Sequence, residues 1–116
     1  MPSVLIVDDH DGFRAVTRTM LECEGFVVVG EAADGARAVE AVGALAPDLV
    51  LLDIHLPDVD GFEVARQLAA LAHPPGVVLT SSRPIADLRR RVAASPAAGF
   101  ISKAELTGSG ILALVE

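Results

Sequence analysis

Five short apolar runs recur along the chain, and they constrain its fold more than any other feature. Each run is almost continuously apolar instead of alternating between apolar and polar residues, which is typical of a strand buried on both faces of a parallel sheet. The runs cover residues 4–7, 26–29, 49–52, 77–80 and 100–102. Runs this short cannot span a bilayer, so we expect no membrane segment.

Segments with helical spacing follow the five runs. In each segment, apolar residues three or four positions apart share one helical face. These faces consist of Phe13, Val16, Met20 and Leu21; Ala38, Val39, Val42 and Leu45; Phe62, Ala65, Leu68 and Ala69; Ile85, Leu88 and Val92; and Ile111, Leu112 and Val115. Five strands that alternate with five helices predict an α/β fold, a doubly wound parallel sheet with right-handed crossovers.

Length and charge narrow the class of protein. The 116 residues suit one domain, and 52% of them are apolar, enough for a single core. The net charge of -7 opposes direct binding to nucleic acid or to an anionic membrane surface. The single cysteine, Cys23, cannot form an internal disulfide, and we expect a small buried hydrophobe there. These features favour a cytoplasmic protein.

Acidic residues follow two of the predicted strands. Asp8 and Asp9 come after the first strand, and Asp53 comes after the third. Ligand sites of such sheets lie at the carboxyl ends of the strands, where these carboxylates would converge and repel one another unless a cation intervenes. Mg²⁺ is the natural cation for such a group of oxygen ligands. The alternative is helix capping, which does not readily explain an adjacent pair of acids.

A hydroxyl and an ammonium follow two further strands. Thr80 ends the fourth strand, and Lys103, the chain's only lysine, follows the fifth. A carboxylate can attack phosphorus when a metal ion and a cation offset the developing charge, so these residues and Asp53 together indicate phosphoryl chemistry. Separately, each has an ordinary alternative, since hydroxyl residues are common in turns and lysines on surfaces.

Four motifs resemble those of the CheY-like receiver domains of two-component response regulators. They are VLIVDDH at 4–10, LLDIHLPDVDGFE at 51–63, VVLTSS at 77–82 and GFISK at 99–103. The resemblance covers residues 1–116 as one receiver domain. It implies a flavodoxin-like sheet with strand order 2-1-3-4-5 and five helices.

The resemblance also implies a role for each residue. Asp53 corresponds to the phosphoacceptor, Asp9 to the direct Mg²⁺ ligand, and Asp8 to the acid that holds the metal through water. The backbone carbonyl of His55 would complete the metal contacts. Thr80 and Lys103 correspond to the residues that contact the phosphoryl group, and Phe100 corresponds to the aromatic switch.

Two stretches narrow the resemblance to the NarL/LuxR-type regulators. Asp8-Asp9-His10 followed by Phe13-Arg14 is one, and the sequence GEAADG at 30–35 is the other. Those regulators carry a C-terminal helix-turn-helix domain, so we expect either a stand-alone receiver or the receiver part of a transcriptional regulator. His10 is expected at the start of the first helix, Pro96 should end the fourth helix early, and Thr107 is the candidate cap of the last.

The expected function is a phosphorylation-dependent signalling switch, without an enzymatic activity on other substrates. The expected partner is a histidine kinase or a phosphotransfer protein, and phosphorylation would change the surface of the fourth helix and fifth strand. A homodimer could form through that surface and the fifth helix. The alternatives are a phosphorylation-independent interaction module and a phosphatase with an aspartate nucleophile, which usually has a second Asp where this chain has His55. A flavin-binding domain is disfavoured by the absence of Trp and Tyr.

Overall fold

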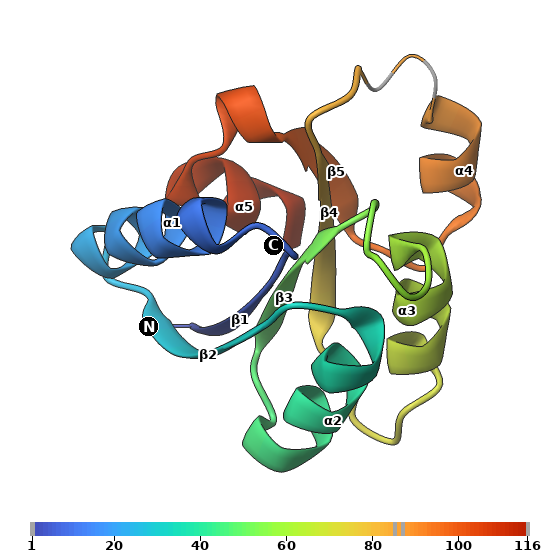
Figure 1. Ribbon diagram of the computed structural model, residues 1–116, viewed down its shortest axis with the longest axis horizontal. Coiled ribbons are helices and arrows are strands. Elements are labelled where there is room, and N and C mark those ends of the chain that lie inside the picture. Colours follow the sequence, from blue (N-terminus) through green and yellow to red (C-terminus); the bar gives the residue numbers. More distant parts are fainter. Residues whose placement is uncertain (1, 85, 87, 116) are drawn as a thin grey trace.

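A five-stranded parallel sheet forms the centre of the molecule (Figure 1). The computed structural model describes residues 2–84, 86 and 88–115. The strands are β1 (Ser3–Val7), β2 (Val27–Ala32), β3 (Leu49–Asp53), β4 (Gly76–Ser81) and β5 (Gly99–Ser102). Their order is β2-β1-β3-β4-β5, and every neighbouring pair is parallel, so the predicted flavodoxin-like topology is confirmed.

Helices cover both faces of the sheet. They are α1 (Asp11–Cys23), α2 (Gly35–Leu45), α3 (Gly61–Ala69), α4 (Arg89–Ala94) and α5 (Gly108–Val115), with a 3-10 turn at Lys103–Glu105. Helices α1 and α5 pack on one face, whereas α2, α3 and α4 pack on the other (Figure 1). This two-sided cover explains why the strands read as apolar runs.

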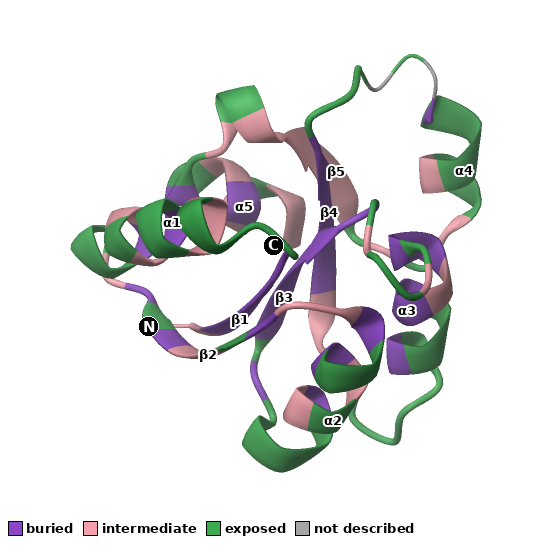
Figure 2. Cartoon of the chain, in the orientation of Figure 1, coloured by how far each residue is buried: buried purple, intermediate pink, exposed green. Residues whose placement is uncertain are grey.

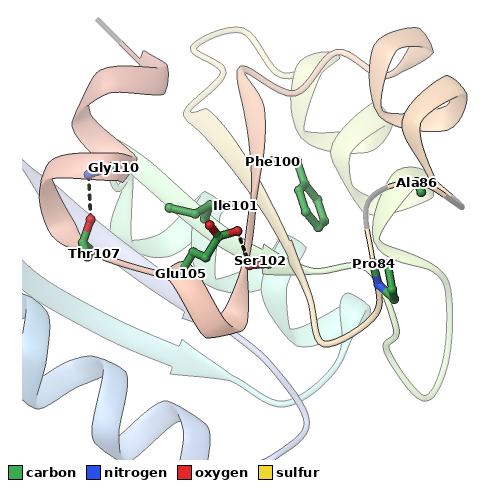
Figure 3. Close-up of a pocket in the computed structure, with 8 residues that line it drawn as sticks. All are labelled: Pro84, Ala86, Phe100, Ile101, Ser102, Glu105, Thr107 and Gly110. Carbon is green, nitrogen blue, oxygen red and sulfur yellow. Dashed lines mark hydrogen bonds between the residues drawn. The ribbon is translucent and has the colours of Figure 1, made fainter.

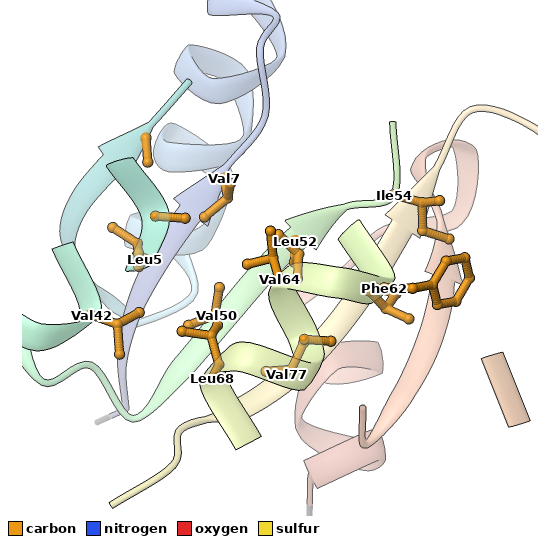
Figure 4. Packing of buried hydrophobic residues seen from close by; sticks show 14 of the residues in the cluster. Leu5, Val7, Val42, Val50, Leu52, Ile54, Phe62, Val64, Leu68 and Val77 are labelled. Atoms are coloured by element: carbon orange, nitrogen blue, oxygen red, sulfur yellow. The ribbon is translucent and has the colours of Figure 1, made fainter. Parts of the chain in front are cut away.

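The two faces bury separate hydrophobic clusters, with β3 buried throughout (Figure 2). Val50 and Leu52 point into the cluster beneath α2 and α3, which also contains Phe62 and Leu68 (Figure 4). Leu51, between them in sequence, points into the cluster beneath α1 and α5. Because successive side chains of a strand face opposite sides, one apolar strand supplies both clusters.

Five residues that we expected to be buried are exposed. Val16 is 71% exposed, and Val27, Leu45, Ala69 and Cys23 also lie on the surface. Helix α1 buries only Thr17 and Leu21, one turn apart, and each residue of a helix is rotated by about 100° from the last. Val16 and Cys23 therefore lie off the buried stripe. Ile85, which we placed on a fourth helical face, lies outside the described residues.

The helices begin and end at the residues that were expected to cap or terminate them. His10 is the N-cap of α1, and its Nδ1 accepts a hydrogen bond from the Phe13 amide at 3.1 Å. The Thr107 hydroxyl accepts a hydrogen bond from the Gly110 amide at 3.0 Å, as expected for the cap of α5. Helix α4 ends at Ala94, two residues before Pro96. Among the described residues, no helix combines the length and apolarity that crossing a membrane requires.

Candidate functional site

Three carboxylates meet at the carboxyl ends of two neighbouring strands. Asp8 and Asp9 follow β1, and Asp53 is the last residue of the adjacent strand β3. One oxygen from each side chain lies within 4.8 Å of the other two. Asp8 and Asp53 are buried, whereas Asp9 is exposed at the rim. The structure therefore brings together the three acids that the strand pattern predicted to converge.

None of these acids is a helix cap, so the capping alternative is wrong. The N-caps of α1, α2 and α3 are His10, Asp34 and Asp60. Instead, one oxygen of each buried acid binds the backbone two residues further on. Asp8 Oδ1 accepts from the His10 amide at 2.8 Å, and Asp53 Oδ1 accepts from the His55 amide at 3.1 Å.

The second oxygen of each buried acid faces Lys103. Its Nζ lies 2.6 Å from Asp8 Oδ2 and 3.4 Å from Asp53 Oδ2, and its side chain is only 20% exposed. The shorter of these two contacts makes Lys103 and Asp8 a close and largely buried ion pair. Lys103 thus contacts both of the buried carboxylates.

Burial and the neighbouring opposite charges shift the pKa values of the Asp53 and Lys103 side chains in opposite directions. Burial raises the pKa of the Asp53 carboxyl, and the charge of Asp8 adds to this, while the His55 amide and Lys103 oppose it. Burial alone would lower the pKa of the Lys103 ammonium, but contact with Asp8 and Asp53 outweighs it, and the pKa is raised. A further cation would relieve the repulsion that one ammonium leaves between the acids.

The residues present fit a hard divalent cation. The three candidate ligands are all carboxylates, and one oxygen of each lies within 4.8 Å of the other two. Three negative charges this close repel one another, and the single ammonium of Lys103 offsets only one of them. Mg²⁺ takes one or two carboxylates and completes its shell with water and substrate oxygens, which suits a site with one exposed acid.

Thr80 and His55 lie beside Asp53. Thr80 is the register partner of Asp53 across β3 and β4, and it is buried. The His55 side chain is exposed, as expected, and its backbone forms a bridge with Asp60. Both residues are therefore close enough in the chain and the sheet to take part in chemistry at Asp53.

Phe100 lies apart from the acids, on the edge strand β5. Phe100 and Ile101 project from opposite sides of the strand (Figure 3). Phe100 is half-buried against the cluster beneath α2 and α3. It also lines a hollow of about 590 Å³ together with Pro84 and Ala86. The ring thus forms part of the wall of a surface hollow at the edge of the sheet.

Sequence reasoning missed the contacts that three residues make in and around the site. The Phe13 ring, placed on a core face, lies under Lys103 with its centroid 4.4 Å from Nζ. Arg14 donates to the Asp8 carbonyl at 2.5 Å and to Glu31 at 3.0 Å. Asp58 accepts from the Gly35 amide at 2.8 Å and from the Ala36 amide at 3.0 Å, and so binds the loop after β3 to the start of α2.

Comparison with known proteins decides the family. The family model of the response regulator receiver domain matches residues 4–114. The chain belongs to this family. This receiver domain is 40% identical over 102 residues to BvgA of Bordetella pertussis, named as a transcription regulator of virulence factors, which covers 88% of the chain and 49% of BvgA. It is 38% identical over 104 residues to the response regulator UvrY of Escherichia coli O157:H7, covering 89% of the chain and 48% of UvrY.

A solved structure supports the same assignment. The signal receiver domain of NarL from Mycobacterium tuberculosis superimposes with a TM-score of 0.84 at 33% identity, covering 98% of this chain and 96% of that one. The predicted likeness to the NarL/LuxR-type receivers is therefore confirmed. The receiver domain spans about half the length of the curated regulators it matches.

Proposed function

We propose that residues 1–116 form one receiver domain that works as a phosphorylation-dependent switch, with Asp53 as the phosphoacceptor. The observation that carries this proposal is the position of Lys103, whose ammonium contacts Asp53 and Asp8 at once. An ammonium in this position can contact a phosphoryl oxygen once Asp53 is modified. The partner that supplies the phosphoryl group is a histidine kinase or a phosphotransfer protein.

Mg²⁺ would be held by Asp8, Asp9, Asp53 and the backbone carbonyl of His55. When bound, it would offset the negative charge of the phosphoryl oxygens. Asp53 contributes the nucleophile, since the His55 amide fixes one carboxylate oxygen and leaves the other facing Lys103. A new bond forms between this carboxylate and phosphorus as the bond from phosphorus to the donor nitrogen breaks.

The remaining residues would read the modification. Lys103 and Thr80 contact the phosphoryl oxygens, and movement of Thr80 makes room for Phe100 to turn inward. The surface of α4 and β5 then changes by a population shift between two packings. This surface, together with α5, is the proposed site of a homodimer.

The location and output are proposals of the same kind. The charge of -7 opposes direct binding to nucleic acid or to an anionic membrane surface, and a single cysteine requires no oxidising compartment, so we propose a cytoplasmic domain. BvgA and UvrY are named as regulators, so we propose that this receiver acts in such a regulator or stands alone. We assign no enzymatic activity beyond the domain's part in its own phosphotransfer and dephosphorylation.

Intact-mass spectrometry tests the proposal. Incubation with phosphoramidate and Mg²⁺ should add one phosphoryl group to the wild type and none to Asp53→Ala. Glu40→Gln, which removes an exposed charge on α2, is the matched control and should take up the group normally. An adduct on Asp53→Ala would refute the assignment. Failure of the wild type to bind Mg²⁺ or beryllofluoride would favour a phosphorylation-independent interaction module.

A further inference from the structure

We propose that Phe13 is a positioning residue for Lys103, whose ammonium it holds over the acidic pocket through a cation–π contact. The Nζ lies 4.4 Å from the ring centroid, within the range in which an aromatic face attracts a cation. The consequence for phosphotransfer rests on the proposed function, whereas the contact itself does not. Through this contact, the first turn of α1 helps to form the acidic pocket as well as packing against the core.

Three groups enclose the ammonium. Two are the Oδ2 atoms of Asp8 and Asp53, and the third is the Phe13 ring. Since the Lys103 side chain is 20% exposed, the ammonium has lost much of its water, and the electron-rich ring face replaces part of it.

The three groups around the ammonium differ in whether other ligands compete with Lys103 for them. The two carboxylates are the groups that a metal ion or a phosphoryl group would engage, so their hold on Lys103 changes during the proposed cycle. The ring is neutral and binds neither. Phe13 can therefore keep the ammonium in place while its carboxylate partners change.

The start of α1 places the ring. His10 caps the helix by accepting from the Phe13 amide, which fixes the backbone of the residue that carries the ring. The next residue, Arg14, donates to the Asp8 carbonyl at 2.5 Å. One helical turn thus holds both the acid and the ring that contact Lys103, so their spacing is set locally.

The competing explanation is that the ring only fills space. Removal of the ring would destabilise the protein under either explanation, so an alanine variant does not separate them. A cation–π contact depends on the electrons of the ring face and not on its volume. Site-specific replacement of Phe13 by pentafluorophenylalanine keeps the shape and removes this attraction, while Phe13→Tyr keeps both.

The chain's single lysine allows a direct test without phosphorylation. Lysine labelled with ¹³C gives one ε-CH₂ signal, which should appear upfield in EDTA-treated wild type because the ring lies beside it. Phe13→Leu should return the signal to the value of free lysine, and Phe13→Tyr should retain the shift. Phe62→Leu is the matched control, since the Phe62 ring contacts Arg91 at 4.3 Å instead, and should leave the signal unchanged.

Binding of beryllofluoride with Mg²⁺ tests the consequence. The fluorinated variant should bind about threefold to tenfold more weakly than wild type, and Phe13→Tyr should bind within about twofold of it. An unshifted lysine signal in wild type would refute the contact, and unchanged affinity of the fluorinated variant would refute the positioning role. If wild type binds no beryllofluoride, the proposed function fails, and the lysine signal alone then decides whether the contact exists.

Discussion

At the scale of single residues, the chemistry of the pocket depends on how one ammonium is shared. Lys103 Nζ is closer to Asp8, at 2.6 Å, than to Asp53, at 3.4 Å. A divalent cation at the three acids would bring a second positive charge to the same carboxylates. We therefore expect Lys103 and such a cation to compete for the negative charge of the pocket.

Lys103→Met should bind Mg²⁺ about tenfold more tightly than wild type. The reason is that two cations a few ångströms apart repel by about 1 kcal/mol or more even in water. Because the chain has neither Trp nor Tyr, isothermal titration calorimetry is the suitable measurement. Arg37→Met removes an exposed positive charge from α2 and should not change the affinity. Unchanged or weaker binding by Lys103→Met would show that the lysine does not compete.

Asp58→Asn should lower the melting temperature at neutral pH, with a smaller difference in acid. The hydrogen bond from the Gly35 amide, followed by that from Ala36, lowers the pKa of the Asp58 carboxyl in the folded protein. A lowered folded pKa gives stability that is present above the unfolded value of about 3.9 and is lost as the pH falls through the folded value. Calorimetry of both proteins from pH 7 to pH 3 checks this.

Glu40→Gln is the control for this pH dependence, because it removes the same charge from an exposed position on α2. Its effect on the melting temperature should be small at every pH. If Asp58→Asn differs from wild type by the same amount at pH 3 and pH 7, the carboxylate does not supply the stabilising cap.

The sequence predicted the acids of the site better than their neighbours. Asp8, Asp9 and Asp53 follow apolar strands, so the topology alone brings them to one edge of the sheet. Phe13 and Asp58 reach the region through contacts with residues distant in sequence, and no local pattern specifies such contacts. Phe13 also fitted an apolar helical face, which concealed its contact with Lys103.

At the scale of elements, the central apolar strands were predicted more accurately than the edge strand β2 and the helix faces. The run at 26–29 gave β2 a different position from the observed Val27–Ala32. Pairing with β1 extends β2 through Gly30 and Glu31, two residues with low strand propensity. Tertiary pairing therefore overrode composition at the edge of the sheet.

Gly61→Ala should destabilise the protein by about 2–3 kcal/mol, as expected for an overpacked backbone contact. A Cβ at Gly61, the first residue of α3, would collide with the Asp53 carbonyl and lie 2.7 Å from Ile54 Cα. These are backbone atoms that cannot move aside. Urea unfolding measures the loss, and wild-type stability in this variant would show that the loop after β3 can yield.

Gly43→Ala provides the opposite case within α2. A Cβ there meets nothing within 4 Å, and alanine is favoured over glycine inside a helix. We expect a gain of about 0.5–1 kcal/mol in the free energy of unfolding. A loss measured in the same urea titration would contradict this reading of the two glycines.

At the scale of the whole molecule, the charge of -7 is partly concentrated in one buried place. A ligand that binds only the folded state adds to the free energy of unfolding an amount that grows with the logarithm of the ratio of its concentration to Kd. At ten times Kd, Mg²⁺ should add about 1.4 kcal/mol to the free energy of unfolding. For a chain of this size, the melting temperature should rise by about 5 °C.

Asp9→Asn should abolish most of this rise, since the exposed acid would contribute a ligand oxygen to the ion and takes no part in core packing. Differential scanning calorimetry with Mg²⁺ and with EDTA provides the comparison. A Mg²⁺-dependent rise that survives in Asp9→Asn would place the ion elsewhere on the acidic surface.

The two hydrogen bonds that Asp58 accepts from the start of α2 have a consequence for slow motions of the chain. The Gly35 and Ala36 amides donate to a loop that begins at the end of β3, next to the acids. We expect these two amide protons to exchange with heavy water when the loop opens and their hydrogen bonds to Asp58 break. Their exchange rates, measured by NMR, would therefore report how often the loop opens. The two amides lie more than fifteen positions away from Asp53 in the sequence.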